Sequence, residues 1–192
     1  MTSSYSDSRR SDAIQNEKLI LRTASHLFDQ YGVKHVTMKQ IAGSAEIGPG
    51  TLYRHFKNKP DICQRLMDDQ VDDMFSNITS YVKEHAKESA SKRIKYVLHV
   101  FLSLKEKNLS LLQEIENAGR KSQALLQTPF YDELKNLIML LFQEVEGIKD
   151  VSFHTDMLLN AFSSDIYYFE RYHQGLSPDD FLEKVCDIYV YR

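Results

Sequence analysis

Apolar side chains recur at helical spacing along most of the chain after its first fifteen residues. Between Asn16 and Tyr31 they fall on one face of a helix, which Gly32 is expected to end. That face consists of Ile20, Ala24, Leu27, Phe28 and Tyr31. The chain has no convincing alternation of apolar and polar residues, the pattern of a half-buried strand. The spacing therefore predicts an all-α protein.

Two short helices joined by a tight turn are predicted between residues 37 and 56. Thr37 and Gln40 form a capping box, so the first helix should begin directly after Thr37. Gly48-Pro49 marks the start of the second, because proline is tolerated at the first helical position, where its missing N–H would be unpaired anyway. This layout is a helix-turn-helix, whose second helix enters the major groove of DNA.

Longer helices are predicted after this segment. Asn58 and Asp61 form another capping pair, which predicts a helix from about Lys59 to His85. The further helices that apolar spacing predicts cover residues 94–104, 109–120, 129–145, 154–173 and 178–189. About nine helices are expected in total.

Three parts of the chain are predicted from these elements. Residues 1–15 are polar and lack the apolar core of a signal peptide, so they should form a flexible N-terminal arm. Residues 16–58 should form a three-helix DNA-binding domain with the helix-turn-helix. Residues 59–192 should form a helical domain for ligand sensing and dimerisation.

Residues 16–61 resemble the N-terminal domain of the TetR family of bacterial transcriptional regulators, the TetR/AcrR type. The matching residues are Ala24, Leu27, Phe28, Gly32, Thr37, Ile41, Ala42, Ile47, Gly48, Gly50, Thr51, Leu52, Tyr53, His55, Phe56, Asn58 and Lys59. One departure is Glu46, which stands in the turn where the family usually has glycine. A positive φ at a residue with a Cβ costs roughly 1 kcal/mol or more, and the carboxylate would lie near DNA.

The resemblance implies specific DNA-contact residues. Thr37, Tyr53 and Lys59 would reach phosphates, while the start of the second helix would approach base edges. Phosphate contacts position a protein on DNA and base contacts specify the sequence. The candidate DNA-binding residues are Thr37, Lys39, Gly48, Pro49, Thr51, Tyr53, Arg54, His55, Lys57 and Lys59. The alternatives are packing for Tyr53, packing or capping for His55, and a merely solvated side chain for Arg54.

The charge distribution agrees with DNA contact at one end of the chain. Residues 1–60 hold nine Lys/Arg and five Asp/Glu, a net charge of +4. Residues 61–192 hold fifteen against twenty-two, a net charge of −7. A basic N-terminal region followed by an acidic remainder is typical of proteins that contact DNA at one end, although a charge difference of this size also arises by chance.

The resemblance further implies a ligand pocket among the middle helices, whose filling moves the helix that begins at Lys59. The candidate pocket residues are Met67, Met74, Phe75, Tyr96, Phe101, Glu116, Tyr131, Phe142 and Phe162. Ordinary core packing is the alternative for each of them. Glu114 and Glu116, with His99 nearby in sequence, suggest a site for a cationic ligand, and a solvated helix face is the alternative.

The last two predicted helices are apolar on more than one face, so they should be buried on more than one face. A second copy of the chain would supply the additional cover. The candidate interface residues are Leu158, Phe162, Ile166, Phe169, Phe181, Val185 and Ile188. The resemblance likewise implies a homodimer formed through a four-helix bundle. Its two recognition helices would lie about 34 Å apart, or a multiple of that, and match a palindromic site.

Other classes of site find little support in the sequence. Cys63 and Cys186 lie far apart without ligand spacing, which predicts buried thiols in a reducing cytosol, with a redox sensor as the alternative. The seven histidines form no metal motif, and no cofactor is predicted. The longest apolar run, Leu137 to Phe142, is far shorter than the ~20 residues that span a bilayer.

The sequence therefore predicts a cytoplasmic, nucleoid-associated homodimer that binds double-stranded DNA and does not act on a membrane. Its predicted role is that of a repressor released from a palindromic operator by a small-molecule effector. A transcriptional activator, or a DNA-dependent adaptor for a protein partner, is the alternative within the same fold. A helical carrier or enzyme is a distant alternative, because the chain shows no nucleophile–base pair, glycine-rich phosphate loop or metal-ligand cluster.

Overall fold

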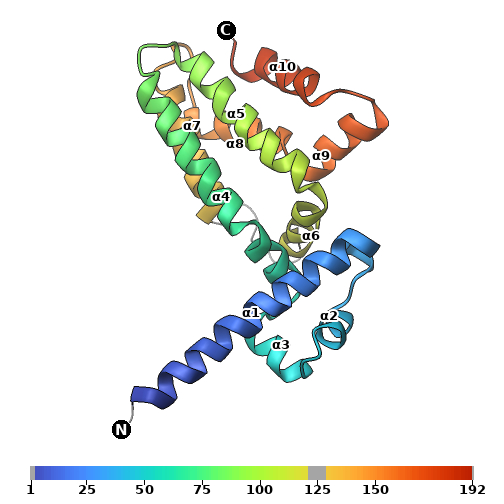
Figure 1. Ribbon diagram of the computed structural model, residues 1–192. Helices are drawn as coiled ribbons and strands as arrows, with labels where there is room; N and C mark the ends of the chain where they lie inside the picture. The colour runs from blue at the N-terminus through green and yellow to red at the C-terminus, as the bar shows by residue number, and fades with distance from the viewer. Residues whose placement is uncertain (1–2, 121–128, 192) are drawn as a thin grey trace. The chain divides into compact units, whose positions relative to one another are not determined.

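The computed structural model describes residues 3–120 and 129–191, which contain helices and no strand. The all-α prediction is confirmed for these residues (Figure 1). The α-helices are α1 (Ser3–Tyr31), α2 (Met38–Ser44), α3 (Pro49–His55), α4 (Lys59–Glu84), α5 (Ala90–Lys107), α6 (Leu109–Arg120), α7 (Pro129–Phe142), α8 (Val151–Ala161), α9 (Ser164–Tyr168) and α10 (Pro178–Tyr189). The chain divides into two compact units, Met1–Asp68 and Asp69–Arg192, and the boundary falls within α4.

The first helix is longer than the sequence predicted. It begins at Ser3 rather than near Asn16, so the described residues assigned to a flexible arm are helical. The first glycine or proline of the chain is Gly32, and nothing before it interrupts a helix. Gly32 ends α1 as predicted, with φ of +81° and its N–H donating to the carbonyl oxygen of Phe28 at 2.9 Å.

The core of the first unit is formed by small apolar faces on all of its helices. α1 contacts α2 and α2 contacts α3. Between α1 and α2, the 3-10 turn η1 (Val33–His35) buries Val33. The side chains buried in this core include Ile20, Ala24, Leu27, Phe28, Ile41, Ala42, Ala45, Leu52, Phe56 and Ile62. Tyr31 is 54% exposed, although its spacing had placed it on the packed face of α1.

In the second unit, α5 contacts α6, α7 and α10 (Figure 1). α8 in turn contacts α7 and α10, and α9 contacts α6. Together these helices enclose a second core, whose buried side chains include Ile94, Val97, Leu98, Phe101, Leu134, Ile138, Phe142, Leu158, Phe162, Tyr167, Leu182 and Cys186.

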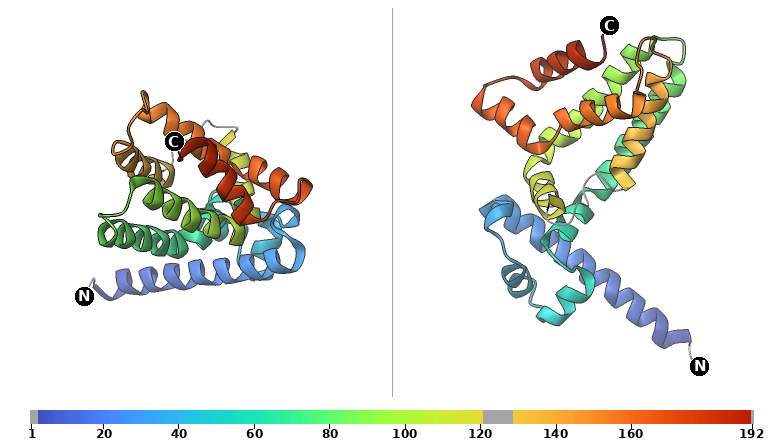
Figure 2. Two further views of the ribbon diagram at one scale, coloured as in Figure 1. Left: turned by 90° about the horizontal axis from the view of Figure 1, so that it is seen from above. Right: turned by 180° about the vertical axis from the view of Figure 1, so that it is seen from behind.

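The helix predicted over residues 154–173 is broken. α8 ends at Ala161, α9 begins at Ser164, and a π-helical turn η3 (Phe169–His173) follows α9. The break lies where the N–H of Ser164 donates to the carboxylate of Glu116 instead of to a helical carbonyl. Gly175, with φ of +77°, then allows the chain to reverse direction before α10 (Figure 2).

Candidate nucleic-acid interface and sensing core

α2 begins with the predicted capping box. The N–H of Gln40 donates to Oγ1 of Thr37 at 3.3 Å, and the N–H of Thr37 donates to Oε1 of Gln40 at 2.8 Å. Two N–H groups at this helix start, which no helical carbonyl accepts, are thereby satisfied. The Thr37 side chain lies on the exposed side of the first unit.

The turn between α2 and α3 contains Glu46 in the left-handed region, with φ of +53°. It is the single non-glycine residue with positive φ among the residues that the structure describes. The turn is closed by the N–H of Glu46, which donates to the carbonyl oxygen of Gly43, and by the N–H of Ile47, which donates to that of Ala42. The Cβ of Glu46 makes this conformation cost roughly 1 kcal/mol or more.

α3 is anchored on one side and open on the other. Leu52 is fully buried, and Phe56, the C-cap residue of α3, is 6% exposed and lies four residues further along the chain. Tyr53 is 54% exposed on the opposite side. A Cβ added at Gly48 or Gly50 would meet nothing within 4 Å, so the start of α3 is open. The backbone at the start of α3 is therefore accessible to close approach by another molecule.

Most of the candidate DNA-contact residues lie at the surface of the first unit. The exposed ones are Thr37, Lys39, Gly48, Pro49, Tyr53, Arg54 and Lys57, and the half-buried ones are Thr51, His55 and Lys59. Lys59 has an internal role that sequence reasoning missed. Its ammonium donates to the carbonyl oxygen of Val33 at 2.8 Å and ties the first residue of α4 to η1.

These features define the class of the protein. A three-helix unit that presents a short, polar, anchored helix after a tight turn is a helix-turn-helix DNA-binding unit. The chain belongs to the tetR family of bacterial regulatory proteins, whose family model matches residues 20–66, and it is a DNA-binding transcriptional regulator.

Two HTH-type transcriptional regulators match this chain over almost its whole length. The HTH-type transcriptional regulator SAR0097 of Staphylococcus aureus (strain MRSA252) is 39% identical over 183 residues, 95% of this chain and 96% of that protein. The HTH-type transcriptional regulator SAB2452 of Staphylococcus aureus (strain bovine RF122 / ET3-1) is 33% identical over 181 residues, 94% of this chain and 96% of that protein.

Solved structures show the same fold. The fold is similar to that of Thermus thermophilus FadR, a TetR-family transcriptional repressor in complex with lauroyl-CoA, with a TM-score of 0.70 and 15% identity. That match covers 90% of this chain and 92% of FadR. The ketosteroid transcriptional regulator KstR2 of Mycobacterium tuberculosis matches with a TM-score of 0.56 and 16% identity, over 92% of this chain and 95% of KstR2.

Three of the predicted pocket residues meet in one aromatic cluster of the second unit. Phe101 lies 5.7 Å from Phe162 and 5.9 Å from Phe130 between ring centroids, and Phe130 lies 5.7 Å from Phe75. We call Phe75, Phe101, Phe130 and Phe162 the aromatic cluster. Phe130, which was not among the predicted pocket residues, joins the others at tilted and edge-on angles typical of aromatic packing.

Glu116 lies beside this cluster, and the alternative that placed it on a solvated helix face was wrong. It is 7% exposed, so it is not on a solvated helix face. Its counter-ion is Lys105, whose Nζ lies 3.3 Å from Oε1 of Glu116 and 5.8 Å from the ring centroid of Phe101. A cationic ligand would therefore meet a carboxylate that already has a cation. Burial lowers the pKa of Lys105, and the neighbouring Glu116 carboxylate opposes that shift.

Lys105 was missed because lysine is usually a surface residue. A signal was nevertheless present in the sequence. Lys105 follows Leu98 by seven residues and Phe101 by four, which places it within the apolar face of α5. A charged residue within such a face requires a buried partner, and Glu116 and Ser164 provide it.

The remaining predicted pocket residues lie elsewhere. Tyr96 stacks on Tyr81 at 3.5 Å and lines a separate, open hollow of about 340 Å³. Phe142 packs edge-on against His154, and the hydroxyl of Tyr131 donates to Asp156. These predicted pocket residues therefore do not share one site. Met74 is buried in the second unit and Met67 in the first.

The candidate interface residues separate into two groups. Leu158, Phe162, Phe181 and Val185 are buried by the helices of their own unit. Those four were predicted from apolar spacing, which does not distinguish burial within a chain from burial between chains. The three that remain exposed are Ile166 (42%), Phe169 (48%) and Ile188 (67%).

Within residues 3–120 and 129–191, no group of three or more His, Cys, Asp or Glu side chains is arranged to hold a metal ion. No described helix is both long enough and apolar enough to cross a membrane. Both cysteines are buried, and burial raises the pKa of the Cys186 thiol to about 11.

Proposed function

We propose that the protein is a homodimeric repressor that binds a palindromic DNA operator through α3 and is released from it by a small-molecule effector. The observation that carries the proposal is that α3 is buried on one side and exposed on the other. The helix is anchored by Leu52 and Phe56, while its start and its outer side are exposed. Residues 16–58 are the proposed DNA-binding domain, and residues 59–192 sense the effector and dimerise.

Two kinds of DNA contact follow from the positions of the side chains. Gly48, Pro49 and Thr51 lie at the start of α3 and would meet base edges, with Arg54 and His55 beside them. The residues proposed to bind phosphate are Thr37, Lys39, Tyr53, Lys57 and Lys59. Base contacts then determine the sequence preference, and phosphate contacts determine the position on the duplex.

The proposed dimer is supported by exposed apolar side chains in the last part of the chain. A monomeric protein rarely exposes a continuous apolar surface of large extent. Eight large apolar or aromatic side chains are exposed on α8, α9, η3 and α10 or directly after α10, and we propose that they form one surface, the apolar face: Phe153, Met157, Ile166, Tyr168, Phe169, Tyr172, Ile188 and Tyr191. In a two-fold symmetric dimer, the two α3 helices would bind successive turns of the DNA, about 34 Å apart or a multiple of that.

The proposed effector site is the aromatic cluster of the second unit. Its rings favour a largely apolar effector, and the neighbouring Lys105 and Glu116 offer polar groups that would orient it. α4 belongs to both units, so its backbone is the direct covalent link from the sensing unit to the DNA-binding unit. We propose a cytoplasmic location and no membrane partner.

The test is selection of bound duplexes from a random DNA pool by the purified protein at moderate salt. An enriched palindrome is the expected result. Salt-sensitive binding without enrichment of any sequence would contradict sequence-specific recognition. Enriched duplexes would then serve as probes for effectors, which should release the protein from them.

A further inference from the structure

α9 and η3 place polar groups inward and apolar side chains outward. Ser164 and Tyr167 are fully buried, whereas Phe169 and Tyr172 are 48% and 54% exposed. An ordinary surface helix shows the opposite arrangement. The exposed side belongs to the apolar face, so in the proposed homodimer a second copy covers it. The inward side consists largely of hydrogen-bonding groups, whose partners are specific.

At the start of α9, Ser164 is hydrogen-bonded to Lys105 and Glu116. The hydroxyl of Ser164 accepts a hydrogen bond from Nζ of Lys105 at 2.6 Å and donates to Oε1 of Glu116 at 2.5 Å. The N–H of Ser164 donates to Oε2 of Glu116 at 2.9 Å. Lys105, Glu116 and Ser164 are 1%, 7% and 0% exposed. One buried network therefore joins α5, α6 and the first turn of α9.

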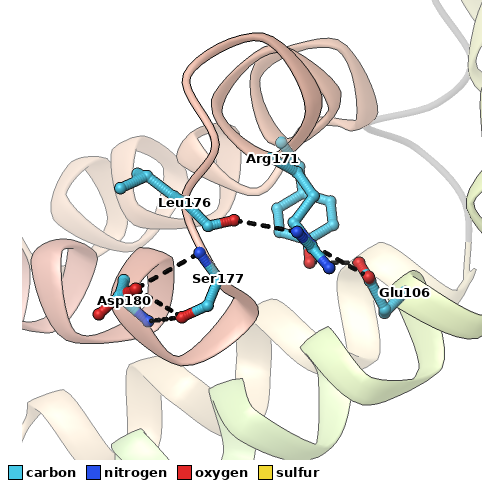
Figure 3. Close-up of polar contacts among 6 residues, drawn as sticks. Glu106, Arg171, Leu176, Ser177 and Asp180 are labelled. Carbon is cyan, nitrogen blue, oxygen red and sulfur yellow. Dashed lines mark hydrogen bonds and ion pairs between the residues drawn. The ribbon is translucent and has the colours of Figure 1, made fainter.

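Glu106, which follows Lys105 on α5, binds the other end of the segment formed by α9 and η3. Its carboxylate accepts a hydrogen bond from the hydroxyl of Tyr167 and another from Nε of Arg171 at 3.2 Å. Arg171 also donates through Nη1 to the carbonyl oxygen of Leu176 at 3.3 Å. Figure 3 shows the Arg171 side chain between Glu106 and Leu176. Burial and the Glu106 carboxylate raise the pKa of Tyr167, so its hydroxyl remains a donor at neutral pH.

The contact at Leu176 extends this second network to the start of α10. Ser177 follows Leu176 and forms a capping box with Asp180, which Figure 3 shows beside it. The hydrogen bonds of the Asp180 carboxylate with Ser177 lower the pKa of Asp180. Arg171 therefore fixes the turn from which α10 begins, and α10 carries Ile188 of the apolar face.

Two adjacent charged residues of α5, Lys105 and Glu106, thus contact opposite ends of the segment formed by α9 and η3. Consecutive residues on an α-helix point about 100° apart, so Lys105 and Glu106 hold Ser164 and Arg171 without competing for the same partner. We call Lys105, Glu106, Glu116 and their partners Ser164, Tyr167 and Arg171 the clasp.

We infer that the clasp positions the apolar face and thereby determines the affinity of the dimer, an inference that rests on the proposed homodimer. A buried ion pair such as Lys105–Glu116 adds little net stability over an apolar pair of similar shape. It does restrict the number of ways in which two elements pack. α9 is short and exposes its apolar side, so polar contacts of fixed geometry determine how Phe169 and Tyr172 are presented to a partner.

Two variants of the full chain test the inference. Lys105→Met/Glu116→Gln removes both buried charges and retains an amide oxygen that accepts from the N–H of Ser164. Glu106→Gln weakens the hold on Arg171. We expect the dimer dissociation constant, measured by sedimentation over a concentration series, to rise about tenfold in each variant. Circular dichroism should show parental helix content in both.

The matched control is Arg93→Met/Glu144→Gln. This pair also joins a buried cation of α5 to a carboxylate, and neither residue lies on α8, α9 or α10. Its removal should change the dimer constant by no more than about twofold, whatever its effect on the melting temperature. A general loss of stability would weaken the control and clasp dimers alike, whereas lost positioning weakens only the clasp dimers.

The outcomes separate the inference from the proposed function. A dimeric parent whose clasp variants dimerise with the parental constant would overturn the inference alone. A monomeric parent at every concentration would overturn both the homodimer and the inference. If the double variant does not fold, Glu106→Gln decides, because its side chain lies at a half-buried position and keeps its shape.

Discussion

The ammonium of Lys59 donates a hydrogen bond to the carbonyl oxygen of Val33, 26 residues earlier in the chain, at 2.8 Å. The bond ties the first residue of α4 to the turn that precedes α2. Lys59 was predicted from its sequence position as a phosphate contact, and that role remains a proposal. A lysine ammonium has three donors, so the bond to Val33 does not by itself exclude a phosphate contact.

Lys59→Ala should therefore have two effects. Loss of the bond to Val33 should destabilise the protein by about 1 kcal/mol. Loss of a phosphate contact should weaken binding to all DNA sequences and reduce the salt dependence by about one unit. Thermal unfolding and titrations of a duplex over a salt series measure the two separately. Lys39→Ala, at an exposed position, is the control that should alter the salt dependence alone. An unchanged salt dependence in Lys59→Ala would assign Lys59 a purely structural role.

Glu46→Gly should stabilise the protein. The left-handed φ of +53° costs a residue with a Cβ about 1 kcal/mol that glycine avoids, so the melting temperature should rise by a few degrees. Glu46→Ala removes the same carboxylate but keeps a Cβ, so it should bring no such gain. If the carboxylate repels DNA phosphates, both variants should bind DNA more tightly. A gain in DNA affinity with glycine alone would attribute the effect to the turn.

Tyr53→Phe separates packing from DNA contact. The side chain is 54% exposed, so removing its hydroxyl should leave the melting temperature unchanged. If the hydroxyl donates to a phosphate, DNA affinity should fall by about 1–2 kcal/mol, or roughly five- to thirtyfold. Tyr31→Phe is a matched control, since Tyr31 is equally exposed on α1. Equal DNA affinity in the Tyr53→Phe and parental proteins would contradict a phosphate contact by the hydroxyl and leave packing as the role of Tyr53.

The parts of the fold that local chemistry determines were predictable from the sequence. The capping box at Thr37 places the start of α2 where the structure has it. Gly48-Pro49 likewise marks the start of α3. A capping box involves residues three apart, so the relevant contacts are visible in a short stretch of sequence. The exposed side of α3 lies opposite Leu52 and Phe56, two apolar residues four apart in the sequence.

The parts that depend on distant contacts were not predictable in this way. The break before α9 reflects the bonds between Ser164 and Glu116, 48 residues apart in the chain. The tie between Lys59 and Val33 is of the same kind. Apolar spacing also marked Leu158 and Val185 as candidates for the dimer, whereas their own unit buries them. Spacing reports that a side chain is buried and does not report by which element.

Cys186 should be unreactive in the folded protein. Burial raises the pKa of its thiol to about 11, so only about one thiol in a thousand is ionised at pH 8, and the thiolate is the reactive form. A Cys63→Ser background leaves Cys186 as the single thiol. A disulfide reagent should then react slowly with native protein and rapidly in denaturant. Rapid reaction under native conditions would show that α10 opens, and would revive a redox role for this residue.

Ile188→Glu should convert the dimer into a monomer. Ile188 is 67% exposed at the end of α10, so the substitution costs the isolated chain little, yet a partner covering the apolar face would bury an uncompensated carboxylate. Sedimentation should show a monomer, and affinity for a full palindrome should fall to that for a single half-site. Leu140→Glu is the matched control, because Leu140 is 61% exposed on α7, outside the apolar face. That variant should stay dimeric, and a dimer that survives Ile188→Glu would place the interface elsewhere on the second unit.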